Sequence, residues 1–93
     1  MSGTIPGSVE IGDAVICQEL QGETVLLNMH NQSYFSLDDV GTVMWQTLLQ
    51  YRSLEAASER LVRMYEADAT TISSDLEQLV GKLMTAGLLR AAD

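Results

Sequence analysis

Two short apolar runs, joined by a polar turn and followed at once by a helix start, place the tightest limit on how this chain can fold. The second run, residues 32–37, alternates aromatic and aliphatic side chains with small polar ones, which suits a pleated strand with one solvent-exposed face. The first run, residues 24–28, is apolar at its centre and is predicted to be a strand, and Asn31 in the link tolerates the left-handed conformation of a tight turn. These features predict a β-hairpin.

A further strand is predicted before this hairpin, at residues 14–20, with the turn Gln21-Gly22-Glu23 after it. Three strands joined by short turns form an antiparallel meander, in which the first and third strands are edges. Residues 32–37 contain no Lys, Pro or acidic residue that would discourage pairing with another chain. The third strand is therefore predicted to be open to a partner.

Three helices are predicted after the strands. Asp38 can cap the first, which extends to about residue 50, and Ser53 can cap a second that ends near residue 66. The third begins at residue 70 or 71 and stops at Gly87, a good left-handed terminus, after which Leu88 and Leu89 can fold back. The fold class is thus α+β, with a three-stranded antiparallel meander followed by three helices.

Apolar spacing on the helices predicts which faces are buried. On the first helix the expected stripe is Val40, Val43, Met44, Leu48 and Tyr51, with Trp45 and Leu49 at its margin. On the third helix it is Ile72, Leu76, Leu79 and Leu83, widened by Val80 and Met84. The widened stripe fits either a helix that serves both the core and a groove beside the edge strand, or a helix that is simply well buried.

The chain has 93 residues, which is enough for one small domain but not for a deep active site on a separate scaffold. Residues 1–12, rich in glycine and holding the only proline, are expected to form a flexible arm before a domain at residues 13–90. No window has the length and apolarity of an export signal or a membrane span, and the lone cysteine excludes an internal disulfide. We expect a cytoplasmic protein.

Charge and residue content argue against several functions. The formal charge of −8 repels nucleic acid and anionic membranes. Cys17 lies mid-strand in an apolar run, the usual setting of an inert buried thiol, and His30 lies in a polar turn, so we do not expect a catalytic pair. The acidic residues lack metal-binding spacing and the glycines are dispersed, so no metal, cofactor or catalytic residue is predicted.

Two groups of short motifs share an order and spacing with a known family. The first is Tyr34-Phe35-Ser36-Leu37-Asp38 with Gly41 and Trp45, and the second is Asp75, Leu79, Leu83 and Gly87-Leu88-Leu89. In this arrangement the chain resembles the pyrroloquinoline-quinone synthesis protein D (PqqD) family over residues 15–89. That family includes the recognition elements of ribosomally synthesised, post-translationally modified peptides. The chain departs from the family at His30-Asn31-Gln32, where a turn with glycine is commoner.

The resemblance implies a winged helix-turn-helix-like fold and a non-enzymatic adaptor. It implies that the leader segment of a precursor peptide adds as a strand to residues 32–37, beside the third helix, as in lasso-peptide pathways where a separate cysteine protease and a cyclase act with such a member. A quinone-cofactor pathway or a radical-modified peptide would fit the same groove. The peptide-binding residues so predicted are Gln32, Ser33, Tyr34, Phe35, Ser36, Leu37, Asp75, Leu76, Leu79, Val80, Leu83 and Met84. The strand register leaves open whether Tyr34 or Phe35 faces the groove.

Two other classes of function fit the order of elements. A DNA-binding winged-helix regulator would need a basic recognition helix, but residues 70–86 offer only Gln78 and Lys82 against Asp75 and Glu77. A structural subunit would instead pair permanently through its free sheet edge.

Overall fold

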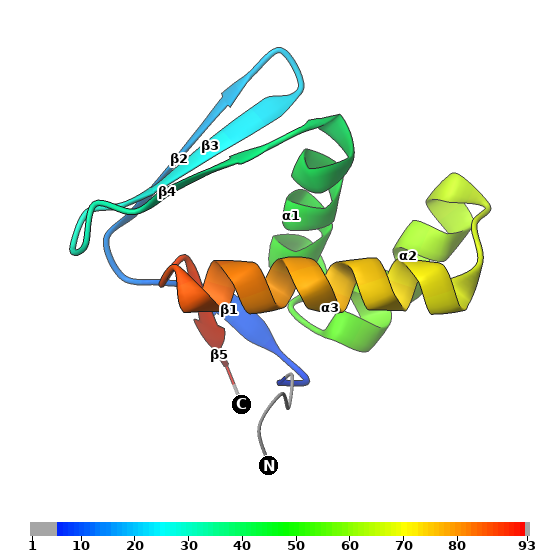
Figure 1. Cartoon of the computed structure of the whole chain (residues 1–93). Helices are drawn as coiled ribbons and strands as arrows, with labels where there is room; N and C mark the ends of the chain where they lie inside the picture. Colours follow the sequence, from blue (N-terminus) through cyan, green and yellow to red (C-terminus); the bar gives the residue numbers. More distant parts are fainter. Residues whose placement is uncertain (1–5, 93) are drawn as a thin grey trace.

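A computed structural model describes residues 6–92 and has an α+β architecture (Figure 1). The elements in chain order are β1 (Val9–Ile11), β2 (Val15–Leu20), β3 (Glu23–Asn28), β4 (Tyr34–Leu37), α1 (Asp39–Tyr51), α2 (Leu54–Tyr65), α3 (Ala69–Thr85) and β5 (Leu89–Ala91). Strands β2, β3 and β4 form an antiparallel sheet in that order, ahead of the three helices. The predicted fold class is confirmed.

The two turns of the meander use left-handed backbone in different ways. Between β2 and β3, Gln21 and Gly22 both have positive φ, the combination that matches the twist of a two-residue hairpin. Between β3 and β4 the left-handed residue is Gln32, at φ 61°, and not Asn31 as the sequence predicts. Asn31 instead accepts a hydrogen bond from the Ser33 amide through its side-chain oxygen, at 2.9 Å. Asn31 therefore supports the turn by its side chain, and Gln32 takes the position that glycine usually fills.

Side-chain caps begin all three helices. The Asp38 carboxylate accepts from the Gly41 amide, and the Ser53 hydroxyl accepts from the Ala56 amide, which confirms both predicted caps. The third helix begins at Ala69, slightly earlier than predicted, because Asp68 supplies its cap. Its end follows the prediction, since Gly87 has φ 75° and the next two leucines are buried.

A second, two-stranded sheet corrects the expected flexible arm over part of its length. β1 pairs antiparallel with β5, and Val9 is completely buried. The Arg90 guanidinium reaches Glu10 at 2.6 Å and Asp13 at 2.8 Å; the hydrogen bond to Glu10, helped by the Asp13 charge, raises the pKa of Arg90. The packed unit thus begins well before residue 13, whereas residues 1–5 of the predicted arm lie outside the described part of the chain.

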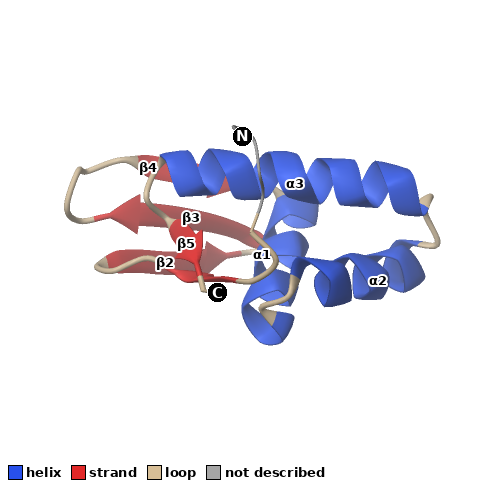
Figure 2. Cartoon of the chain, turned by 90° about the horizontal axis from the view of Figure 1, so that it is seen from below, coloured by secondary structure: helices blue, strands red, loops and turns tan. Residues whose placement is uncertain are grey.

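The core lies between the inner face of the meander and the three helices (Figures 1 and 2). Trp45 is 1% exposed and occupies this core, whereas Val40 and Tyr51 are both more than 40% exposed. The buried face of α1 is therefore rotated toward Trp45 from the predicted stripe, because both the sheet and α2 pack on that side. Within residues 6–92 no helix has the length and apolarity to cross a membrane.

Candidate functional site

The free edge of β4 is the first element of the candidate site. In the meander β3 lies in the middle, so β4 has a paired side toward β3 and an opposite side that carries no strand among residues 6–92. Figure 2 shows β4 and α3 at the same edge of the molecule, with β2 at the other edge. An unpaired edge of this kind exposes backbone donors and acceptors in a row.

The hydrogen bonds of the β3–β4 turn determine which backbone groups of β4 point outward. The Asn28 amide donates to the Ser33 carbonyl at 2.8 Å, so this opposed pair is a hydrogen-bonded one. Hydrogen-bonded and non-bonded pairs alternate along an antiparallel ladder, so the register makes Leu26↔Phe35 the next bonded pair. The amides and carbonyls of Tyr34 and Ser36 consequently face the free edge.

The direction of the side chains on β4 shows whether Tyr34 or Phe35 faces the helices. Leu37 is 4% exposed and Phe35 is half-buried against the core, so both lie on the inner face. Tyr34 is 71% exposed and lies on the outer face of the sheet with Ser36. Phe35 is therefore the aromatic residue on the side of α3.

The two flanks of α3 face different neighbours. The Ser73 hydroxyl lies 2.9 Å from the Ser58 hydroxyl of α2, which marks the flank toward α2. A second stripe, Asp75, Leu79 and Lys82, follows at i, i+4 and i+7 on the opposite flank. In this second stripe the acidic and basic side chains are exposed and Leu79 is half-buried. The stripe therefore offers one apolar contact between a negative and a positive group.

The C-terminal end of α3 is tied to the turn before β4 by Asn28. This side chain is 5% exposed, and its amide nitrogen donates to the carbonyls of Ala86 at 3.2 Å and Gly87 at 3.0 Å. Its oxygen accepts from the backbone amides of His30 and Asn31. A Cβ on Gly87 would lie 2.5 Å from the Asn28 amide nitrogen, so this close approach also needs a glycine. Asn28 thus holds α3 in place relative to β4, and sequence reasoning missed it because nothing local marks a buried amide.

The structure confirms the buried position predicted for Leu76 and Leu83 of α3 and corrects the placement of Val80 and Leu79. Leu76, Val80 and Leu83 are each at most 1% exposed and belong to the core. Val80 was expected at the margin, but it lies seven residues after Ser73, on the flank toward α2. Met84 is half-buried and lies on the same flank. The wide apolar stripe of α3 therefore serves the core, and Leu79 is the half-buried apolar residue on the opposite flank.

Two of the remaining predicted site residues lie where β4 begins, and the third lies on α3. Gln32 is exposed in the turn, Ser33 is half-buried and pairs with Asn28, and Asp75 is exposed near the start of α3. Lys82, which the sequence analysis considered only as a residue that could contact DNA, shares a stripe with Asp75 and Leu79; the i, i+4, i+7 spacing could have identified it.

Groups with potential chemistry do not gather at this edge. Cys17 is exposed, which corrects the buried position expected for it; it lies on β2, the edge strand on the other side of the sheet from β4. Among the described residues, no three His, Cys, Asp or Glu side chains are grouped as a metal site would require. The arrangement supplies backbone pairing and apolar contact, the elements of peptide recognition by strand addition.

Comparison with known proteins gives a family match and two similar solved structures. Residues 23–89 match the family described as coenzyme PQQ synthesis protein D (PqqD). The solved structure "TbiB1 in Complex with the TbiA(beta) Leader Peptide" is similar, with a TM-score of 0.82 and 30% sequence identity, over 90% of this chain and 98% of that one. "Lasso peptide synthetase B1 complexed with the leader peptide" has a TM-score of 0.79 and 23% identity, over 89% and 98%. A search of curated proteins finds no match.

Proposed function

The chain belongs to the coenzyme PQQ synthesis protein D family, and on that premise we propose that it binds the leader segment of a precursor peptide as an added strand on β4. The observation that carries the proposal is the free edge of β4, where the backbone groups of Tyr34 and Ser36 point away from the sheet. The similar TbiB1 structure, itself a complex with a leader peptide, supports the same role for this chain.

Backbone pairing alone would not hold a leader tightly. Two outward residues present two donors and two acceptors, and each net hydrogen bond contributes about 0.5 to 1.5 kcal/mol. Micromolar binding needs about 8 kcal/mol. Apolar contacts must supply the difference, and we assign them to Phe35 on the inner face of β4 and to Leu79 on the flank of α3 away from α2, both of which are half-buried.

Asp75 and Lys82 are assigned a second role, selection by charge. They lie on either side of Leu79 along the helix, Asp75 toward its N-terminal end. A leader residue beside Asp75 is favoured if basic, and one beside Lys82 if acidic. Because both groups are exposed, each should adjust affinity modestly and mainly fix the position of the leader along α3.

The protein acts in this proposal as a non-enzymatic adaptor in the biosynthesis of a ribosomally synthesised, modified peptide, of which a lasso peptide is the favoured case. A separate cysteine protease and a cyclase would then act on the leader that it presents. We place this work in the cytoplasm, where ribosomal precursors are made. Support comes from the unpaired edge of β4 and from the fold that this chain shares with the solved lasso peptide synthetase B1.

Fluorescence polarisation tests the proposal with the labelled leader peptide of a candidate precursor, chosen from short reading frames that flank the gene of this chain. Saturable binding at about micromolar or tighter affinity is expected, with a scrambled leader of identical composition binding at least about tenfold more weakly. Equal binding of the two peptides would refute it. Size-exclusion chromatography with light scattering, run on the same samples, detects the rival arrangement in which two copies pair through β4.

A further inference from the structure

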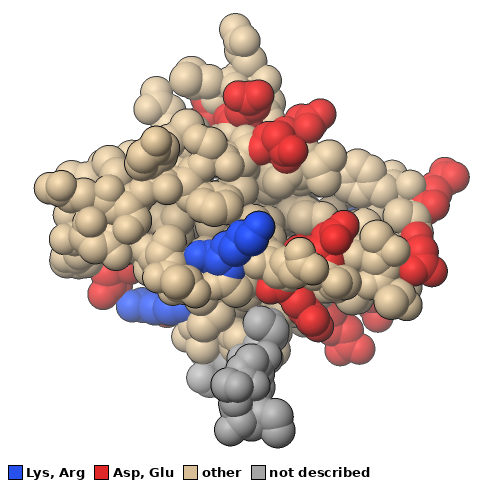
Figure 3. Space-filling view, in the orientation of Figure 1, with Lys and Arg blue, Asp and Glu red and all other residues tan. Residues whose placement is uncertain are grey.

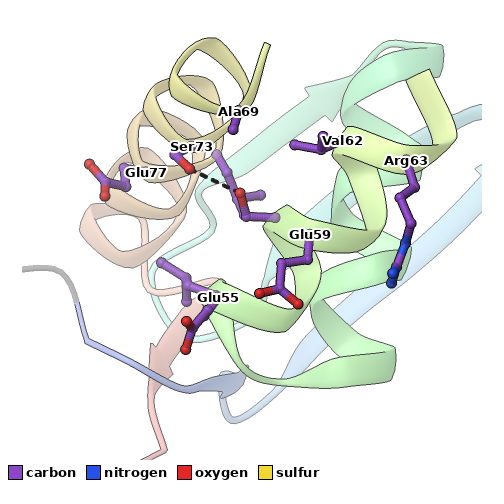
Figure 4. Close-up of a pocket in the computed structure, with 10 residues that line it drawn as sticks. Glu55, Glu59, Val62, Arg63, Ala69, Ser73 and Glu77 are labelled. Atoms are coloured by element: carbon purple, nitrogen blue, oxygen red, sulfur yellow. Dashed lines mark hydrogen bonds between the residues drawn. The ribbon is translucent and has the colours of Figure 1, made fainter. Parts of the chain in front are cut away.

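A pocket of about 610 Å³ lies between α2 and α3, away from the β4 edge (Figure 4). Its apolar lining comes from both helices, and Val62 of α2 points toward Ala69 at the start of α3. Leu76 closes it toward the core, and the hydrogen-bonded pair of Ser58 and Ser73 crosses between the helices. The pocket is within the range of about 300 to 1,000 Å³ that ligand sites occupy.

Acidic residues surround this apolar pocket. Glu55 and Glu59 come from α2 and Glu77 from α3, all three exposed, with Arg63 as the one basic residue in the lining. Within residues 6–92 the ion pairs are those of Arg90, so the rim carboxylates have no cationic partner there. Figure 3 shows acidic side chains gathered over the half of this face that holds α2 and the start of α3. The rim is therefore complementary to a basic ligand.

The pocket is separate from the leader edge, although both use α3. Ser73 and Glu77 line the pocket and occupy one flank of the helix, whereas Leu79 lies on the other flank. A ligand in the pocket and a strand on β4 would therefore contact opposite sides of the same helix. The two sites can be occupied together.

We propose that the groove between α2 and α3 docks an amphipathic helix of a second protein, with aliphatic side chains in the pocket and Lys or Arg side chains against Glu55, Glu59 and Glu77. The groove lies between two packed helices, and a third helix can bury its apolar face there. The unpaired acidic rim selects a basic helix over an acidic one. The inference goes beyond leader binding and does not depend on it, because none of the pocket residues lies on β4.

Designed peptides test this directly. The probes are helical peptides of about 14 residues, roughly four turns, made of Leu, Ala and Lys. Each peptide contains two leucines, which are three, four or seven residues apart in the three versions. A matched set replaces every Lys by Glu. Each is titrated into the ¹⁵N-labelled full chain, and backbone amide shifts map the site.

At least one Lys peptide should shift amides of α2 and α3 around Val62 and Ser73 in a saturable way, while its Glu counterpart binds at least about tenfold more weakly. Glu59→Lys should weaken the Lys peptide about three- to fivefold. The control Glu23→Lys changes the net charge equally on an exposed residue of the β2–β3 hairpin and should leave affinity within about twofold.

The proposal would be overturned if no peptide of the set shifted the pocket amides, or if the shifts fell on β4 instead. It would also be overturned if Glu59→Lys and Glu23→Lys weakened binding equally, because that result would show a response to net charge alone. Leader binding is measured on the same variants by fluorescence polarisation and should be unchanged by Glu59→Lys. Failure of the leader to bind would bear on the proposed function and leave the pocket result standing.

Discussion

Proline substitutions at two neighbouring residues of β4 separate the outward side of the strand from its paired side. The amide of Ser36 faces the free edge, so Ser36→Pro removes no hydrogen bond within the protein. The amide of Phe35 faces β3 in the Leu26↔Phe35 pair, so Phe35→Pro removes one bond of the ladder and places the proline ring against β3.

The two substitutions should lower the free energy of unfolding by clearly different amounts. For Phe35→Pro, the proline ring conflicts with β3 and one hydrogen bond of the ladder is lost. The carbonyl of Leu26, a completely buried residue, is left without a partner, which costs about 1 to 3 kcal/mol. A domain of this length is stable by roughly 5 to 14 kcal/mol, so the lost bond and the steric conflict together should remove a large part of this stability. Ser36→Pro should cost less than about 1 kcal/mol.

Urea unfolding followed by circular dichroism measures stability, and fluorescence polarisation measures leader binding. Ser36→Pro should fold and bind the leader at least about tenfold more weakly, because it lacks one intermolecular donor and its ring obstructs the incoming strand. Ser36→Ala and Phe35→Ala control for loss of each side chain. A folded Ser36→Pro variant with unchanged affinity, or equal destabilisation by the two prolines, would show that the assigned register is wrong.

Three further predictions follow from burial and hydrogen bonding. Asn28→Ala should lower the free energy of unfolding by about 2 to 4 kcal/mol in urea titrations, since two carbonyls and two amides lose a buried partner. A change below about 0.5 kcal/mol, the size typical of a surface substitution, would exclude a structural role for Asn28. Leu79→Ala should weaken leader binding by about 5- to 30-fold and lower the free energy of unfolding by roughly 1 kcal/mol. Val80→Asp should not fold, because its carboxylate would be buried without a partner. A folded Val80→Asp variant would contradict the core position of Val80. The exposed Cys17 thiol should react fully with Ellman's reagent in the native protein, and Cys17→Ser should bind the leader normally; a thiol that reacts only in denaturant would contradict that exposure.

Local signals explain why the order of elements could be predicted. Asp38 and Ser53 cap helices through amides three residues away, so a short stretch of sequence contains the whole interaction. The β1–β5 sheet could not be predicted in this way, because its pairing depends on residues such as Glu10 and Arg90 that are 80 positions apart. Three-residue strands also carry too little alternation to stand out.

The candidate site was predicted at the level of elements but not of faces. Periodicity shows that the apolar stripe of α3 is wide, but only the position of α2, marked by the Ser58–Ser73 contact, assigns Val80 to the core and Leu79 to the other flank. The outward backbone groups of β4 depend in turn on the left-handed Gln32, which sets the phase of the ladder. Such facts arise from tertiary packing and turn geometry, which residue spacing does not encode.

Residue-resolved hydrogen exchange on the chain, with and without a saturating leader peptide, tests the central claim most directly. In the free protein the amides of Tyr34 and Ser36 face solvent and should exchange fast, while the Phe35 amide, bonded within the sheet, should already be protected. Addition of the leader should slow exchange at Tyr34 and Ser36 by at least about tenfold, because both amides then donate to the added strand. A leader that binds while these two amides exchange as fast as before would contradict strand addition on β4.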